Sequence, residues 1–537
     1  MYAGTARAFP ITDPANPPVV TNTPDEADLR NQLQLHNNFL APAGGGWTIT
    51  PRVSVSEVLN DNVFQTSSNR RFDLITLISP GITILGDTPR AQVTFDYQPS
   101  LAWYARTPSE TGVSQQLAGT ALFTIIPDEF YVDARAVSGV IAANGGFGAF
   151  GGYGGVNSVA GASLGGGSLG TGGSVGLSKQ NQTQFSSLSL SPYWLHSFKD
   201  IGTAKIGYSI NESSFSNTGS FLPLFFPTGS NAQRMTTNEL FAQFQTGDYF
   251  GRIQDVVQAD ATKSTGSGAT STSSQATITN RTTYALYDWI SVYGTIGLEN
   301  ISYAGTPSQH IADTVWGFGT TLIPNPDSSI TIGYGHQNGA TSIQFSGYYA
   351  LTAHTTLSAS YSTAVQTQLQ QIQNQLNQTA INVNGVLVNS QTGQPIFLTN
   401  TALGVQAGLY KTSTFTFTAT TVLDRDVISL TALYQNSSLV SSAANASAAS
   451  NHGTTGAATW TRQIREDLTL ATSLSYSVST FTGSGTTTSI GAVASLQYLI
   501  SETLTGNLRY AFFDQKSATP GQSIYQNLFL IGITKQF

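Results

Sequence analysis

The chain has 537 residues, of which 40% are hydrophobic and only 9% are charged, and its formal net charge is −7. Soluble domains carry roughly 25% charged residues, so the composition argues against an ordinary water-soluble domain. The mild negative charge gives no sign of a nucleic-acid partner. The absence of cysteine fits an envelope protein that forms no disulfides.

Apolar residues are distributed in alternation with polar ones and not in long runs. A helix that spans a membrane needs about 20 consecutive apolar residues, and the sequence contains no such run. Strands of an outer-membrane barrel alternate apolar and polar residues. The composition therefore predicts an all-β protein, a transmembrane antiparallel up-and-down barrel of the bacterial outer-membrane type.

The N-terminal segment 1–46 lacks this alternation and is rich in Pro, Asn and Ala. Met1–Pro10 contains no apolar core of a secretory signal, so we expect the signal to have been removed. The segment is predicted to be a flexible periplasmic arm or to enter the lumen. Barrels of 22 strands include plugged transporters, but 46 residues are too few for a plug domain, so an energised nutrient transporter is not expected.

From Trp47 to Phe537, short polar turns alternate with longer links, which predicts the barrel domain 47–537. The short turns are 86–89, 127–129, 198–200, 246–248, 287–289, 324–327, 352–354, 424–426, 465–467 and 501–503. The other links are 60–71, 107–116, 142–182, 217–234, 263–273, 305–311, 337–341, 365–404, 439–450, 481–487 and 516–521. Outer-membrane barrels have short periplasmic turns and long extracellular loops. The pattern therefore predicts about 22 strands, with both termini in the periplasm.

The two faces of the predicted strands differ in polarity. The segment 93–106 places Val93, Phe95 and Trp103 on one face and Asp96 and Gln98 on the other. Hydroxyls on nearly every strand could not be buried in a dry sandwich core without partners, so the polar face is assigned to the lumen. Three tryptophans near short turns predict an interfacial aromatic girdle: Trp194, Trp289 and Trp460.

Charged and tyrosine side chains on the polar face are the candidate pore-lining residues. Both signs of charge occur, so the lumen is not built for one class of ion, and hydroxyls and rings offer weak sites for sugars. For any one residue the alternative is mutual neutralisation across the wall, as for Asp133 with Arg135. The candidates are Arg52, Asp96, Tyr104, Arg106, Tyr131, Asp133, Arg135, Tyr193, Lys205, Glu239, Arg281, Tyr293, Glu299, Tyr348 and Arg509.

Two long links have unusual compositions. The Gly-rich loop 142–182 either folds into the pore and narrows it or is a low-complexity extracellular loop. The Gln-rich loop 365–404 spaces Leu369, Ile372 and Leu376 as on one face of a helix. This spacing predicts an amphipathic helix that caps or enters the pore mouth, with a disordered Gln-rich strip as the alternative.

No catalytic or metal-binding pattern is present. No Gly-rich run follows a strand and opens a helix as a phosphate loop does. We therefore expect no enzyme activity, no cofactor and no metal. The histidines lack metal spacing and are assigned to interfaces or loops: His36, His196, His310, His336, His354 and His452.

The last strand alternates and ends on an aromatic residue, as outer-membrane barrels commonly do. Phe529, Ile531, Ile533 and Phe537 share one face and form the predicted assembly signal. The expected partners are the bilayer with its lipopolysaccharide, the barrel-assembly machinery, and polysaccharide or envelope export proteins. The expected location is the bacterial outer membrane.

Several short stretches of the chain form a recognisable set: Pro51–Glu57, Asn60–Phe64, Ile78–Gly81, Pro127–Ala136, the Gln-rich 366–378 with Asn384–Gly385 and Thr392–Pro395, and Gly532–Phe537. These stretches resemble a family of outer-membrane barrels associated with exopolysaccharide and PEP-CTERM gene systems and related to β-barrel porins. The resemblance covers most of 47–140 and 365–537, whereas the Gly-rich loop and the low charge depart from it. It implies a barrel fold and passage of polysaccharide.

These features predict a porin-like outer-membrane channel for passive passage of hydrophilic solutes or of an exopolysaccharide chain. The alternative is a structural barrel that anchors extracellular polymer or an assembly partner. A lumen filled by residues 1–46 or 142–182 would favour that alternative.

Overall fold

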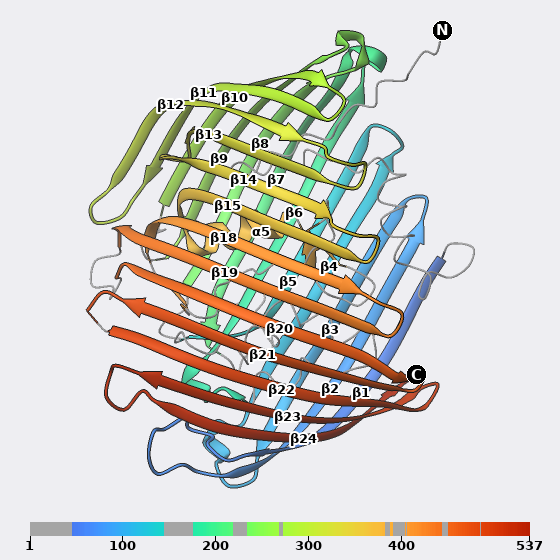
Figure 1. Cartoon of the computed structure of the whole chain (residues 1–537), viewed down its shortest axis with the longest axis vertical. Coiled ribbons are helices and arrows are strands. Elements are labelled where there is room, and N and C mark those ends of the chain that lie inside the picture. Colours follow the sequence, from blue (N-terminus) through green and yellow to red (C-terminus); the bar gives the residue numbers. More distant parts are fainter. Residues whose placement is uncertain are drawn as a thin grey trace.

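The strands form one closed antiparallel barrel. The computed structural model describes residues 46–143, 176–217, 233–267, 272–377, 379–381, 387–389, 403, 405–406, 408–442, 449–483 and 485–537. Within them, a 22-stranded sheet closes on itself because β1 pairs with β2 on one side and with β24 on the other (Figure 1). The prediction of an all-β barrel with 22 strands is confirmed. The N-terminal arm and most of the Gly-rich loop lie outside the described residues.

The barrel strands follow one another around the ring in chain order. They are β1 (Gly46–Asn60), β2 (Asp73–Thr88), β3 (Ala91–Tyr104), β4 (Gly112–Ile126), β5 (Phe130–Ala142), β6 (Gln182–Ser197), β7 (Gly202–Asn217), β8 (Gln233–Thr246), β9 (Ile253–Gly266), β10 (Thr272–Tyr287), β11 (Ile290–Tyr303), β12 (Gln309–Leu322), β13 (Ser329–Gln337), β14 (Ala340–Ala350), β15 (Thr355–Thr367), β18 (Leu409–Val422), β19 (Asp426–Ser441), β20 (Asn451–Arg465), β21 (Leu468–Phe481), β22 (Gly485–Ser501), β23 (Leu504–Ser517) and β24 (Ile524–Gln536). The 3₁₀ turns η1 (Pro108–Glu110), η3 (Lys179–Asn181), η4 (Lys199–Ile201) and η5 (Asp248–Phe250) lie in links. Helix α5 (Gln368–Leu376) and the small pair β16 (Thr379–Ile381) and β17 (Leu387–Asn389) lie between β15 and β18.

Alternation of side chains along each strand produces two different faces. In β3, Asp96 and Ser100 are buried while Leu101 and Trp103 are exposed. The predicted assembly-signal residues are exposed on the outside: Phe529, Ile531 and Ile533 in β24, and Phe537 directly after it. Lipid cannot form hydrogen bonds with the N–H and C=O groups of a free strand edge. Closure of the ring pairs these groups between neighbouring strands.

The links between strands lie at the predicted places, although the links at 338–339 and 482–484, predicted among the longer links, are as short as the turns. Every predicted short turn overlaps a link between consecutive strands. Trp194, Trp289 and Trp460 are exposed near the ends of strands at these short turns. The structure therefore places all three where a girdle would lie.

The polar face points inward, and its hydroxyls bond to one another across neighbouring strands. Ser54 pairs with Thr534 across the closing β1–β24 contact at 2.6 Å. Further pairs occur around the ring: Ser79–Ser100, Ser138–Ser186, Ser187–Ser213, Thr237–Ser264, Ser360–Thr416, Thr363–Ser413 and Ser477–Ser489. These pairs supply the partners that a buried hydroxyl needs.

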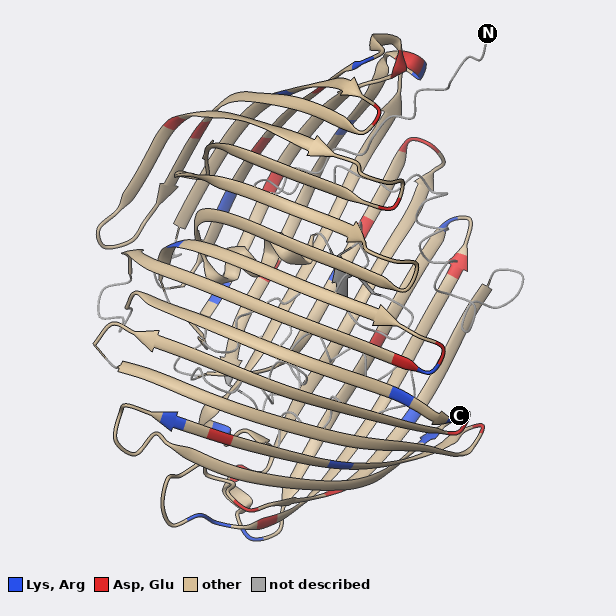
Figure 2. Cartoon of the chain, viewed as in Figure 1, with Lys and Arg blue, Asp and Glu red and all other residues tan. Residues whose placement is uncertain are grey.

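Few charged residues lie along the strands, and many of those present are close to the strand ends (Figure 2). In the part of the chain that the structure describes, no helix is long and apolar enough to span a membrane.

One part of the ring departs from a continuous ladder. The β13–β14 hairpin is short: β12 pairs with β13 only from Trp316–His336 to Leu322–Ile330. The hairpin turn lies at 338–339, and beyond it the sheet has no β13–β14 strands between β12 and β15. There the ends of β11 and β12 contact the ends of β15, β18 and β19 through side chains, in a cluster that includes Ile301, Tyr303 and Val365. We call this region, 309–315 of β12 together with 362–367 of β15, the seam.

Candidate functional site: the lumen

The inner wall carries a buried ion pair on the first three strands. The Arg52 guanidinium donates to both oxygens of Asp96, at 2.8 and 3.0 Å, and also to Thr83 Oγ1 at 2.6 Å. Arg52 is 4% exposed and Asp96 is 3% exposed. The pair is bidentate and enclosed, which is the strong geometry for arginine and carboxylate. It therefore links β1 to β3 across β2.

A second ion pair anchors the helix inside the barrel. Arg135 Nε and Nη2 donate to Asp133, each at 2.9 Å. Arg135 Nη1 also donates to the carbonyl oxygens of Leu376 and Asn377, at 3.3 and 2.6 Å. These carbonyls end helix α5, where a cation is favoured by the helix dipole. The predicted neutralisation of Arg135 by Asp133 is present, and the same arginine also binds the helix.

Helix α5 docks on the inner face of β4 to β8. Its apolar side chains Leu369, Ile372 and Leu376 are at most 2% exposed. They pack in one cluster with Ala118, Val137, Ile141, Phe185, Phe215 and Met235 of the wall. Gln373 Oε1 accepts a hydrogen bond from Thr237 at 3.2 Å. The predicted amphipathic helix entering the barrel is confirmed.

The helix begins with a complete capping box. The Thr367 side chain accepts from the backbone N–H of Gln370, and the Gln370 side chain accepts from the backbone N–H of Thr367. Such a box satisfies two N–H groups that the first turn leaves free. The helix therefore starts sharply where β15 ends.

An aromatic cluster surrounds a lysine on the wall beside Asp133. The Tyr131 and Tyr193 rings stack with centroids 5.4 Å apart. Lys205 Nζ lies 4.1 Å from the Tyr193 ring centre, a cation–π distance. A Cβ at Gly207 would overlap the Phe241 ring, so this glycine provides the space into which the ring folds.

A second cation stacks on a tyrosine further around the ring. Arg281 lies over the Tyr293 ring with its Cζ 3.7 Å from the ring centre. The Tyr293 hydroxyl lies over Gly333, where any Cβ would collide with it. Aromatic residues that cover glycines on neighbouring strands stabilise barrels in this way.

The described parts of the long links meet at the mouth of the lumen. Gln65 donates to the Gly176 carbonyl at 2.8 Å and accepts from Ser178 and Asn181. Lys179 Nζ donates to the carbonyls of Ser109 and Thr111, each at 3.1 Å. On the other side, the Val405 N–H donates to the Ala143 carbonyl at 3.0 Å. These contacts join the described parts of the long links to one another at this end of the barrel.

Most of the predicted lumen residues lie in strands, on the face that alternation assigns to the interior. Glu239 and Arg509 are buried there, and Tyr348 is half-buried on β14. Tyr104 belongs to an apolar cluster of the inner wall, together with Phe513 and Leu530. Whether these side chains line a conducting path stays a prediction.

The placement of Arg106 on a strand is wrong. β3 ends at Tyr104, because the Asp73 carboxylate accepts the backbone N–H groups of Arg106 and Thr107, at 2.9 and 2.8 Å, in place of a ladder partner. Arg106 is exposed in the link, with its guanidinium 5.2 Å from the Phe72 ring centre.

Sequence reasoning missed several residues of the interior. Phe241 and Asp260 face inward beside one another in the β8–β9 register, and Thr237 binds α5. His336, assigned to an interface or loop, lies at the end of β13 close to Glu299 and Asp313. Glycines inside the strands, such as Gly207 and Gly333, were the available signal for the aromatic contacts.

A closed ring with an apolar outer face and a polar, hydrogen-bonded interior defines a transmembrane β-barrel. The fold is that of a bacterial outer-membrane barrel protein.

The chain is similar to the FrpB iron transporter of Neisseria meningitidis (apoprotein of the F5-1 variant), with a TM-score of 0.50 and 9% identity over 95% of this chain and 82% of that one. It also matches the ferric-catecholate import receptor Fiu of E. coli K12 in its open form, with a TM-score of 0.48 and 11% identity over 93% of this chain and 82% of that one. The siderophore receptor PiuA of Acinetobacter baumannii gives a TM-score of 0.47 and 9% identity over 93% and 82% of the two chains.

No protein-family model matches the chain. No curated protein matches it either. The resemblance to exopolysaccharide-associated barrels therefore stays a prediction, and the structural likeness concerns the fold.

Proposed function

We propose that this protein is an outer-membrane transport protein that passes hydrophilic solutes through a lumen narrowed by helix α5. The observation that carries the proposal is an amphipathic helix docked on an inner wall that carries many buried polar side chains beside a few apolar clusters. Cross-strand hydroxyl pairs such as Ser187–Ser213 and Ser477–Ser489 present oxygen atoms to the interior. A wall of this kind binds polar solutes weakly at many sites, which conduction requires.

The helix can move without opening the barrel. α5 takes no part in the 22-stranded ladder. Its contacts with the opposite wall include the apolar cluster around Ile372, the Arg135 bonds to Leu376 and Asn377, and the Thr237–Gln373 bond. Displacing it would therefore widen the lumen and leave the sheet intact.

The nature of the solute is part of the proposal. Small hydrophilic solutes and a polysaccharide chain both suit a wall of hydroxyls, amides and tyrosines. The resemblance to exopolysaccharide-associated barrels supports the polymer, whereas FrpB, which has the same fold, is described as an iron transporter. We place passive passage first because the interior polar groups are spread around the ring and are not gathered at one site. Lipopolysaccharide, the barrel-assembly machinery and export proteins are the proposed partners.

The second candidate is a scaffolding barrel, and the hydrogen bonds that join the long links favour it. Links bonded through Gln65 and Lys179 occupy the mouth beside α5. In that case the docked helix would be a permanent part of the structure, and no solute would pass.

Reconstitution separates the two candidates. The purified protein is inserted into planar bilayers and into liposomes, and conductance and swelling are measured with sugars from glucose to long malto-oligosaccharides. We expect ion conductance and swelling with small sugars, and an increase of both in a variant with residues 368–377 replaced by a short Gly/Ser link. A folded barrel that conducts in neither form would reject transport and leave the scaffold. Passage of long oligosaccharides would favour the polymer version.

A further inference from the structure

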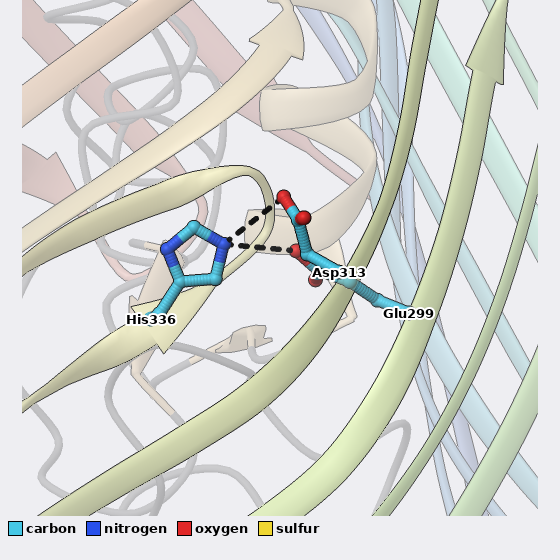
Figure 3. A group of neighbouring side chains, drawn as sticks. All are labelled: Glu299, Asp313 and His336. Atoms are coloured by element: carbon cyan, nitrogen blue, oxygen red, sulfur yellow. Dashed lines mark ion pairs between the residues drawn. The ribbon is translucent and has the colours of Figure 1, made fainter.

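A histidine and two carboxylates converge at the base of the seam, on three successive strands. Glu299 comes from β11, Asp313 from β12 and His336 from the end of β13, and one ligand atom of each lies within 4.8 Å of the others. Figure 3 shows the imidazole facing both carboxylates. His336 Nε2 is 3.4 Å from Asp313 Oδ2 and 3.8 Å from Glu299 Oε1.

Neighbouring groups hold two of these side chains in place. Both Glu299 oxygens accept backbone N–H groups of the hairpin turn, from Asn338 at 2.7 Å and from Gly339 at 2.9 Å. His336 Nδ1 lies 2.7 Å from the Thr341 hydroxyl. The other ring nitrogen, Nε2, is enclosed and has no hydrogen-bond partner among the described residues. The bond between Nδ1 and the Thr341 hydroxyl is an outer hydrogen bond, and such a bond orients the ring of a histidine that ligates a metal through its other nitrogen.

The negative charges of Glu299 and Asp313 also favour a bound cation. The Glu299 side chain is 0% exposed, and a second carboxylate, Asp313, lies next to it. Two neighbouring carboxylates, one of them buried, repel each other unless a positive charge lies between them. A doubly charged ion would offset both.

The spacing suits a small divalent metal. Zn²⁺ binds imidazole nitrogen and carboxylate oxygen at about 2.0–2.2 Å, so two ligand atoms in a tetrahedral site are roughly 3.4 Å apart. The 3.4 Å between His336 and Asp313 meets this value, and the 3.8 Å between His336 and Glu299 needs only a small closure. A mixed set of one imidazole and two carboxylates fits Zn²⁺ and related first-row ions better than Ca²⁺ or Mg²⁺, which take oxygen ligands.

We propose that Glu299, Asp313 and His336 form a binding site for a divalent first-row transition metal. The Asp313 side chain is 52% exposed, so this side of the site is open for the ion to enter and for water to complete the coordination. Bound metal clamps the β13–β14 hairpin to β11 and β12 at the point where the β12–β13 ladder stops. The site is independent of what passes through the lumen.

Titration with Zn²⁺ tests the site on the full-length barrel in detergent after treatment with a chelator. We expect calorimetry to show one Zn²⁺ per chain, and thermal unfolding to shift upward when Zn²⁺ is added. His336→Ala and Asp313→Asn should each weaken binding by at least about tenfold and remove the shift. Asp313→Asn changes a half-exposed side chain, so its fold is retained, and heat-modifiable mobility in gels checks this for both variants.

His310→Ala is the matched control, because His310 is an exposed histidine on β12 that lies outside the group. It should bind Zn²⁺ as the wild type does. Absence of stoichiometric Zn²⁺ binding in the wild type would overturn the proposal and leave the group as an ion pair between the imidazole and the carboxylates. The proposal would also be overturned if His310→Ala lost as much Zn²⁺ binding as the two site variants, or if the two site variants bound Zn²⁺ as the wild type does.

Discussion

Helix α5 offers the sharpest test of how the lumen is controlled, through the substitution Ile372→Asp. Ile372 is 0% exposed and lies in the cluster with Phe185, Phe215 and Met235 of the wall. Truncating a buried isoleucine costs about 2–5 kcal/mol, and a carboxylate without a partner in that pocket adds to the cost. Even 2 kcal/mol changes the ratio of docked to undocked helix by roughly 30-fold.

Other contacts of the helix remain, so the change shifts the population toward the undocked helix and does not release the helix completely. They include the packing of Leu369 and Leu376, the Arg135 bonds to the helix end, the Thr237–Gln373 bond and the Gln406–Gln368 bond, and a hydrogen bond contributes about 0.5–1.5 kcal/mol net, or up to about 3 kcal/mol with a charged donor. The ladder of the barrel is untouched. We therefore expect Ile372→Asp to fold, and to show larger single-channel conductance and faster sugar-driven liposome swelling than the wild type.

Asn374→Asp is the control, because it adds the same charge two residues away on the exposed side of the helix. It should behave as the wild type does. If Ile372→Asp and Asn374→Asp conducted equally, with both barrels folded, the idea that α5 restricts the lumen would be refuted.

Three further substitutions test the wall itself. Arg52→Ala should lower the free energy of unfolding in urea by about 3–5 kcal/mol, because it leaves Asp96 buried without its ion-pair partner. Leu474→Arg places a charge on the outer face, where Leu474 is 63% exposed, and should cost about 2–4 kcal/mol at the bilayer midplane in lipid refolding titrations. Gly333→Ala should lower the unfolding temperature in detergent, because the new Cβ overlaps the Tyr293 hydroxyl and overpacking costs about 1–3 kcal/mol.

Each of these has a matched control. Replacing both Arg52 and Asp96 by apolar residues should recover much of the lost stability. A single Arg52→Ala variant as stable as the wild type would mean that water solvates the Asp96 carboxylate that is left behind, and would contradict the prediction. Ala471→Arg, on the inner face of the same strand as Leu474, should refold normally. Gly294→Ala has open space around its Cβ and should leave the unfolding temperature unchanged; a loss as large as that of Gly333→Ala would contradict the steric explanation.

The strand series could be predicted from the sequence because its signals are local. A period of two and a polar turn are properties of adjacent residues, so Asp96 and Trp103 reveal their faces within one segment. The same holds for the helix that contains Leu369 and Ile372, since its spacing is visible in nine residues. Arg106 shows the limit of this reasoning, because β3 is ended by a carboxylate from Asp73 on another strand.

The arrangement inside the ring depends on residues that are far apart in the chain. Arg135 binds the end of a helix that follows it by about 240 residues, and no local pattern relates the two. Glu299, Asp313 and His336 meet because the β13–β14 hairpin is short and its turn folds against β11. The sequence by itself determined the solvent of each face and the series of strands, and its spacing indicated the helix, because these features depend on neighbouring residues. Only the tertiary structure decided where the helix docks and which charges share a site, because these depend on the register around a closed ring.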